Sequence, residues 1–280
     1  MPGTENETTN VDTGTEQLLC SIRQRVAVIT LNRPEAKNAL SDELTPALRR
    51  MILHCADDPG VGALLITGAG RAFCAGGDVK SMASRPIGGE LPFETRVAEL
   101  RERQRTLTGA LLAVRKPTIA ALPGAAAGAG LALALACDVR LAAESAFVTT
   151  GYARVALSGD YGISALLTRT LGSARARELL LTSQRIDAIR CEAIGLVSRV
   201  LPDAQLQDAA FELACELANG PGEALRAIKD NLDDALVVDF ATSLDREAER
   251  LLNAAGHADH AEAVRAFVEK RPPVFGRGRG

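Results

Sequence analysis

Residues 118–138 read TIAALPGAAAGAGLALALACD, and this stretch decides the fold. It is uncharged up to its last residue, and an apolar run of this length would also suit a membrane-spanning helix. Pro123-Gly124 interrupts the run, however, and further glycines follow within one helical turn. The pattern therefore predicts a short buried strand over 118–122, a tight glycine-rich turn, and a buried helix over 131–136.

The segments on either side repeat this alternation of strand and helix. Short apolar runs such as VAVITL (26–31) and ALLIT (63–67) are typical of buried strands. Ser41 precedes a helical pattern as an N-cap, and Gly172 ends another. Strands are predicted over 19–22, 26–31, 63–67, 118–122, 139–142 and 147–149, and helices over 41–55, 94–115, 131–136 and 163–171. Such alternation predicts an α/β fold with mainly parallel strands.

The two ends of the chain differ from this core. Residues 1–15 are polar and aperiodic, which predicts a disordered tail before a core over 16–204. Residues 205–275 are helical in pattern and predict a region that packs on a neighbouring subunit, followed by a short tail over 276–280.

Composition excludes several classes of partner. The net charge of −3 over 280 residues gives no electrostatic reason to expect nucleic acid or an anionic membrane surface. The six cysteines are widely spaced, which predicts buried thiols rather than disulfides or a metal site. No secretory signal pattern is visible, so the cytoplasm is the expected compartment.

Two glycine segments could present bare backbone N–H groups. One is FCAGGD (73–78), where consecutive glycines follow a strand, and the other is GAAAGAG (124–130), which opens the buried helix. Each could stabilise an oxygen that gains negative charge. Each could equally be a structural feature, a tight turn in the first case and close strand–helix packing in the second.

Asp160 lies between two glycines in LSGDYG (157–162), just ahead of an apolar helix. It could cap that helix, or it could be a carboxylate in an apolar pocket with a raised pKa and a proton to exchange. The chain has only three histidines and no GxSxG motif, so a serine–histidine triad is not indicated.

Four blocks together resemble the crotonase superfamily, the enoyl-CoA hydratase/isomerase family. They are LNRPEAKNAL (31–40), AFCAGGD (72–78), residues 124–138 and residues 159–172, and the AFVEKR ending (266–271) is also similar. The resemblance implies a spiral of ββα repeats followed by helices that build trimers, commonly paired into hexamers. It also implies a coenzyme A thioester as substrate, with no tightly bound cofactor.

The resemblance also assigns site residues by position. The thioester oxygen would lie between the N–H groups of Gly77 and Ala129, with Asp160 where several isomerases of the family carry their base. The other implied substrate-binding residues are Arg33, Ala36 and Lys37 along the coenzyme, Ala75, Asp78, Ala132 and Tyr152 near the acyl group, and Phe267 and Lys270 from a neighbouring subunit.

The sequence departs from the family's hydratases at the two glutamates that handle water, because Ala132 and Tyr152 stand at those positions. One remaining carboxylate, Asp160, predicts double-bond isomerisation through an enolate. Three alternatives stay open. One is a hydratase that recruits Glu90, Glu94 or Glu99. The others are a dehalogenase-like reaction, for which residues 60–250 lack the needed histidine, and a catalytically inactive acyl-CoA-binding relative.

Overall fold

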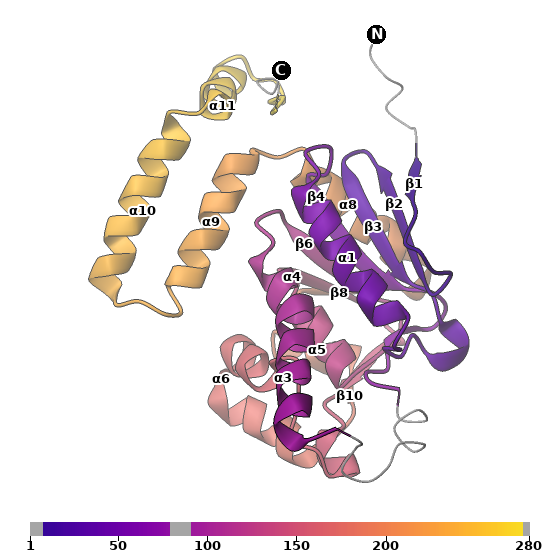
Figure 1. Cartoon of the computed structure of the whole chain (residues 1–280). Coiled ribbons are helices and arrows are strands. Elements are labelled where there is room, and N and C mark those ends of the chain that lie inside the picture. Colours follow the sequence, from indigo (N-terminus) through magenta and orange to yellow (C-terminus); the bar gives the residue numbers. More distant parts are fainter. Residues whose placement is uncertain (1–7, 79–90, 277–280) are drawn as a thin grey trace.

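The computed structural model describes residues 8–78 and 91–276, and two β-sheets form its core (Figure 1). The larger sheet has the strand order β1-β2-β3-β4-β6-β8-β11, and the smaller has the order β10-β9-β7-β5. The strands are β1 (Thr9–Val11), β2 (Leu18–Arg23), β3 (Val26–Leu31), β4 (Ala63–Gly68), β5 (Ala72–Cys74), β6 (Thr118–Leu122), β7 (Ala125–Ala127), β8 (Val139–Ala143), β9 (Phe147–Thr149), β10 (Ile186–Asp187) and β11 (Arg199–Leu201).

Consecutive strand pairs link the two sheets into a spiral. In β4/β5, β6/β7 and β8/β9 the first strand joins the larger sheet and the second joins the smaller. Both sheets are parallel at their centres, and every residue of β4 and β6 is buried. Parallel sheets need both faces covered, which explains why these strands are apolar throughout. The predicted α/β class and ββα spiral are confirmed.

The helices follow the strand pairs, as predicted, and several fall within a few residues of the expected ranges. They are α1 (Leu44–Asp57), α3 (Phe93–Gln104), a π-helical segment (Arg105–Gly109), α4 (Ala110–Ala113), α5 (Ala129–Leu135), α6 (Ile163–Thr182), α7 (Ala188–Ala193), α8 (Leu206–Ala218), α9 (Gly222–Asp234), α10 (Phe240–Ala255) and α11 (Ala258–Val268). Gly172 leaves helical geometry, as predicted, but helix α6 resumes beyond it.

Two predicted boundaries need correction. The disordered tail was predicted through residue 15, but β1 pairs antiparallel with β2, and the buried Thr13 hydroxyl donates to Leu18 O at 2.7 Å. The separate C-terminal region was predicted from residue 205, but α8 buries its apolar face, from Leu206 to Ala218, against the larger sheet. The helices that extend away from the core therefore begin at α9.

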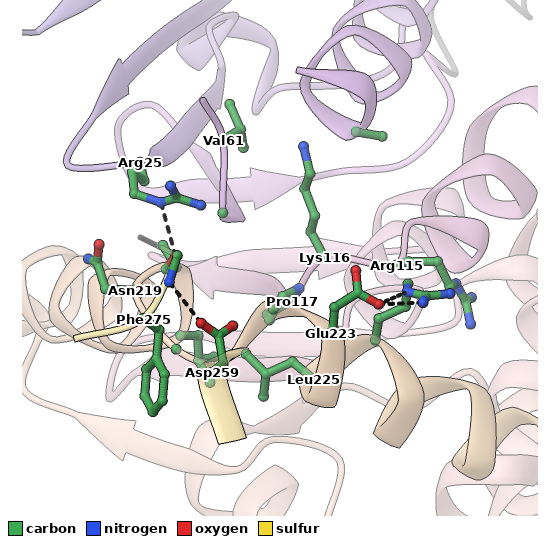
Figure 2. Close-up of a pocket in the computed structure, with 18 residues that line it drawn as sticks. Arg25, Val61, Arg115, Lys116, Pro117, Asn219, Glu223, Leu225, Asp259 and Phe275 are labelled. Atoms are coloured by element: carbon green, nitrogen blue, oxygen red, sulfur yellow. Dashed lines mark hydrogen bonds and ion pairs between the residues drawn. The ribbon is translucent and has the colours of Figure 1, made fainter. Parts of the chain in front are cut away.

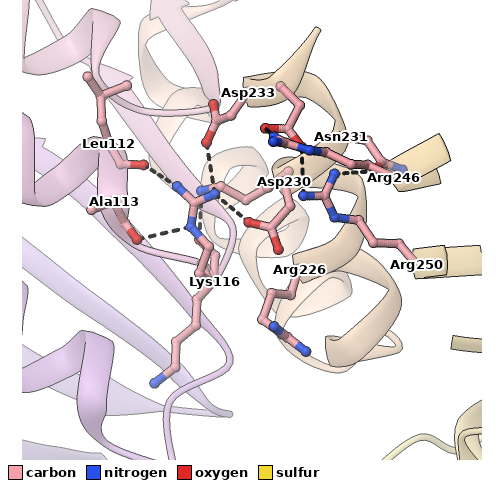
Figure 3. Close-up of polar contacts among 12 residues, drawn as sticks. Leu112, Ala113, Lys116, Arg226, Asp230, Asn231, Asp233, Arg246 and Arg250 are labelled. Atoms are coloured by element: carbon pink, nitrogen blue, oxygen red, sulfur yellow. Dashed lines mark hydrogen bonds and ion pairs between the residues drawn. The ribbon is translucent and has the colours of Figure 1, made fainter. Parts of the chain in front are cut away.

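Ion pairs attach these extended helices to the core. Arg115, which follows α4, contacts Asp230 at 2.9 Å and Asp233 at 2.8 Å on α9. Figure 3 labels these two aspartates. Lys229 of α9 reaches Asp138 at 2.7 Å. Helix α10 lies antiparallel beside α9 in Figure 1, so the two form an arm along one side of the molecule.

Candidate active site

A cavity of about 600 Å³ lies where α1, α3 and two loops meet. Loop 75–78 follows β5, and loop 156–162 precedes α6. In parallel α/β sheets, loops at the carboxyl ends of strands are the usual place for a ligand. The described residues that line the cavity are Leu40, Ser41, Asp42, Thr45, Pro46, Arg49, Gly77, Asp78, Leu100, Arg103, Asp160 and Tyr161.

The two glycine segments lie against each other beside this cavity. A Cβ at Gly76 would stand 2.7 Å from Ala127 O and 3.4 Å from Ala129 N, and one at Gly130 would stand 2.2 Å from Cys74 O. Only glycine permits these approaches, and the φ of +89° at Gly76 also favours it. Ala129 is the first residue of α5, so its N–H has no acceptor within its own helix. Within the described residues, the Gly77 N–H likewise donates to no other group.

The loop after β3 holds the 75–78 segment in place. Ala75 N–H donates to Lys37 O at 3.0 Å, and Leu40 N–H donates to Gly76 O at 2.8 Å. The Arg33 guanidinium lies 3.3 Å from Asp78 Oδ2, and both side chains are largely buried. These contacts fix the direction of the Gly77 N–H before any ligand binds.

Asn38 organises that bracing loop from inside. It is fully buried in the left-handed region, with φ at 56°. Its amide donates to Ala69 O at 2.9 Å and Ala72 O at 2.8 Å, and its Oδ1 accepts from Arg33 N–H at 2.8 Å. Sequence reasoning quoted this residue but missed its importance, although asparagine is one of the few non-glycine residues that adopt this backbone region readily.

Asp160 does not cap α6. The N-cap position belongs to Gly162, and no side chain bonds there. Instead Asp160 Oδ1 accepts the Tyr152 hydroxyl at 2.5 Å. Tyr161 beside it has a φ of 50°, between glycines that also have positive φ, and this strained conformation holds the carboxylate at the cavity wall. The N-cap interpretation is therefore wrong.

The surroundings of Asp160 favour its neutral form. Burial raises the pKa of the Asp160 carboxyl, and the hydrogen bond from Tyr152 acts in the opposite direction. Burial and the adjacent carboxylate both raise the pKa of Tyr152. The phenol therefore stays protonated and donates a hydrogen bond to Asp160. The Tyr152 ring is also close to Gly128, where a Cβ would meet its Cζ at 3.7 Å. Asp160 is thus linked to the start of α5.

A second cavity, of about 210 Å³, lies near the residues that precede β4 and β6 (Figure 2). Its polar groups are engaged in structural contacts. Lys116 Nζ donates to two backbone oxygens of the α1 terminus, Arg25 donates to Ala218 O, and Asp259 accepts from Gly276 N–H. It separates the core from α9 and contains none of the predicted site residues.

Comparison with known proteins identifies the family of this chain. The sequence profile described as enoyl-CoA hydratase/isomerase matches residues 21–278. The chain belongs to the enoyl-CoA hydratase/isomerase family. The "probable enoyl-CoA hydratase echA8" of Mycobacterium tuberculosis is 37% identical over 261 residues, which cover 93% of this chain and 98% of that one. The "1,2-epoxyphenylacetyl-CoA isomerase" of Escherichia coli is 35% identical over 260 residues, with the same two coverages.

Solved structures of this family have the same fold. The crystal structure of a "putative enoyl-CoA hydratase/isomerase" from Mycobacterium abscessus superposes with a TM-score of 0.85 at 34% identity, covering 92% of this chain and 99% of that one. The crotonase superfamily inferred from four sequence blocks is therefore confirmed.

The structure brings most, but not all, of the predicted site residues together. Gly77, Asp78 and Asp160 line the larger cavity, and Tyr152 contacts Asp160. Arg33, Ala75 and Lys37 make the contacts that brace loop 75–78. Ala36 is in the short helical turn Pro34–Ala36, and Ala129 and Ala132 are in the first turns of α5. Phe267, 86% exposed, and Lys270 lie at the end of α11, far from α3 in Figure 1. Their predicted role requires a neighbouring subunit.

The proposed accessory glutamates gain no support as proton donors. Glu94 and Glu99 are exposed on α3, and neither lines the cavity; Glu99 lies 3.7 Å from Arg103. Glu90 lies outside the described residues. Within residues 8–78 and 91–276 no cluster of side chains suits a metal ion, and no helix is long and apolar enough to span a membrane.

Proposed function

We propose that this chain isomerises the double bond of an enoyl-CoA thioester, with Asp160 as the acid/base. The observation that carries the proposal is a largely buried carboxylate, Asp160, that forms no ion pair within the described residues and lines the same cavity as Gly77. Asp78, also in the cavity, is paired with Arg33, and Tyr152 keeps its phenolic proton. A double-bond shift needs a single group that takes and returns a proton, whereas water addition usually needs more.

In the proposed reaction Asp160 removes a proton from the carbon beside the thioester carbonyl. The carbonyl oxygen becomes an enolate oxygen, which the Gly77 and Ala129 N–H groups would stabilise as hydrogen-bond donors. Asp160 then returns the proton two carbons further along, and the double bond moves into conjugation. The burial that raises the pKa of Asp160 makes it a stronger base and suits it to this exchange.

The coenzyme would lie along the loop after β3. Arg33, Ala36 and Lys37 are on this loop, and Lys37 is exposed. Phe267 and Lys270 of a second subunit would complete the site, which also requires that the chain assembles as a trimer or hexamer. All six cysteines are free and five are buried, which supports a reducing compartment such as the cytoplasm.

The proposal is tested with purified protein and 3-enoyl-CoA and 2-enoyl-CoA thioesters in deuterated water. We expect 3-enoyl-CoA to become 2-enoyl-CoA, with deuterium at the carbons that exchange protons. NMR and mass spectrometry detect the product and its deuterium. Formation of 3-hydroxyacyl-CoA instead would favour hydration, the activity named for several relatives. Binding of both thioesters without turnover or deuterium uptake would support the inactive acyl-CoA-binding alternative.

Replacing Tyr152 by Phe should shift the pH dependence of the reaction. The Tyr152 hydrogen bond favours the ionised form of Asp160, so its loss raises the pKa of that carboxyl further. The rising limb of kcat/KM against pH, which follows ionisation of the base, should move up by about 1–2 pH units. An unchanged profile would show that Tyr152 does not tune Asp160.

The arm formed by α9 and α10, together with α11, should be the contact between subunits. Its exposed apolar side chains include Phe240, Leu251 and Leu252, the last of them 73% exposed. Sedimentation should give three or six times the 29.4 kDa chain mass, and Leu252→Asp should shift the protein toward monomers. Leu53→Asp, on an exposed position of α1, is the control and should leave the assembly intact. A monomeric parent protein would contradict this assembly.

A further inference from the structure

The walls of the larger cavity are unusually polar for a site that accepts a plain alkyl chain. Among the described lining residues only Leu40, Pro46 and Leu100 have aliphatic side chains. Two arginines, Arg49 of α1 and Arg103 of α3, line the same space as Gly77 and Asp160. An alkyl chain placed there would remove these charges from water without giving them a partner, which is unfavourable.

The acidic neighbours leave these two cations available to a ligand. Asp78 is paired with Arg33 at 3.3 Å, and Asp160 accepts the Tyr152 hydroxyl. The third acidic residue of the lining, Asp42, is exposed to solvent. Arg103 contacts Glu99 at 3.7 Å, but both side chains are about half exposed, and such surface pairs are weak. The Arg49 Nε–H is buried and has no hydrogen-bond partner in the described part of the chain.

Tyr161 lines the same cavity as the two arginines. Burial raises the pKa of its phenol, and the charges of Arg49 and Arg103 act in the opposite direction. The phenol therefore remains a hydrogen-bond donor beside two cations. A planar guanidinium can bind both oxygens of a carboxylate at once.

We propose that the acyl group turned over here carries a carboxylate at the end remote from the thioester, held by Arg49, Arg103 and Tyr161. The substrate class is then an enoyl-CoA of a dicarboxylic acid. This inference rests on the proposed isomerisation and specifies its substrate. The thioester oxygen would lie at Gly77 and Ala129, and the remote carboxylate between α1 and α3.

The test compares 3-hexenedioyl-CoA, which ends in a carboxylate, with 3-hexenoyl-CoA, which ends in a methyl group. We expect the wild-type protein to prefer the first by about tenfold or more in kcat/KM, because hydrogen bonds to charged groups are strong. Arg49→Gln and Arg103→Gln should each reduce that preference by about tenfold, chiefly because kcat/KM for the carboxylate substrate falls. Arg49→Lys keeps the charge but loses the planar guanidinium group, so its substrate preference should lie between those of the wild type and Arg49→Gln.

Matched controls lie on the same helices. Arg50→Gln on α1 and Arg101→Gln on α3 remove equal charge at positions outside the cavity lining, and they should keep the preference. Equal kcat/KM for the two substrates, or a preference unchanged in the Arg49 and Arg103 variants, would overturn this inference while isomerisation stands. If neither substrate reacts, the proposed function fails instead, and calorimetric binding decides the inference: equal affinity for the two thioesters overturns it.

Discussion

Asp160→Asn should lower kcat for double-bond migration by about 10²- to 10⁴-fold, the usual contribution of a positioned acid/base. The amide has the same size and can still accept the Tyr152 hydroxyl, so the loop should keep its shape. Thioester binding should change little, because the proposed coenzyme contacts lie on the loop after β3. Isomerisation and deuterium uptake, measured beside affinity by calorimetry, check this.

Glu144→Gln is the matched control for that experiment. Glu144 is an exposed carboxylate that follows β8, outside the cavity, and its loss should leave the rate unchanged. Activity that survives Asp160→Asn would remove Asp160 from the chemistry and leave it a structural role beside Tyr152.

Gly76→Ala should have the second largest effect, about 10²-fold in kcat, because it disturbs the proposed oxyanion donor rather than the proposed base. The new methyl group would stand 2.7 Å from Ala127 O, so loop 75–78 and β7 must separate. The Gly77 and Ala129 N–H groups could then no longer bind one thioester oxygen as proposed. Steady-state kinetics on 3-enoyl-CoA measure the loss.

Gly195→Ala separates backbone strain from this geometric effect. Gly195 has a φ of +79°, close to the +89° of Gly76, but no atom lies within 4 Å of its hypothetical Cβ. Both variants should lose some stability in thermal unfolding, and only Gly76→Ala should lose activity. Equal kinetic losses in the two variants would argue that general destabilisation, not the donor geometry, explains the result.

Much of the larger sheet could be predicted from sequence because its strands are apolar on both faces. The strand over 118–122 agrees with β6, and the 26–31 run with β3. The smaller sheet could not be predicted as a sheet. Its strands β5 and β7 have three residues each, too few to show a period, and their glycine-rich ends resemble turns.

The candidate site could be predicted only in part, because some of its contacts depend on tertiary packing. Family motifs point to Gly77, Ala129 and Asp160 as site residues, but no motif gives the Tyr152–Asp160 hydrogen bond. That contact depends on a loop in which Tyr161 and the flanking glycines have positive φ, and such conformations are set by tertiary packing. Arg49 and Arg103 were missed because helical charges usually face solvent, and sequence alone does not orient α1 and α3.

The spiral of strand pairs also sets an order of events during synthesis. Each strand of the smaller sheet can pair only after the strand one turn of the spiral later has been synthesised, since β5 pairs with β7 and β7 with β9. Such non-local pairing makes folding slow. Loop 75–78 and the start of α5 are translated before Asp160, so a nascent chain has the proposed oxyanion donors before it has the proposed acid/base.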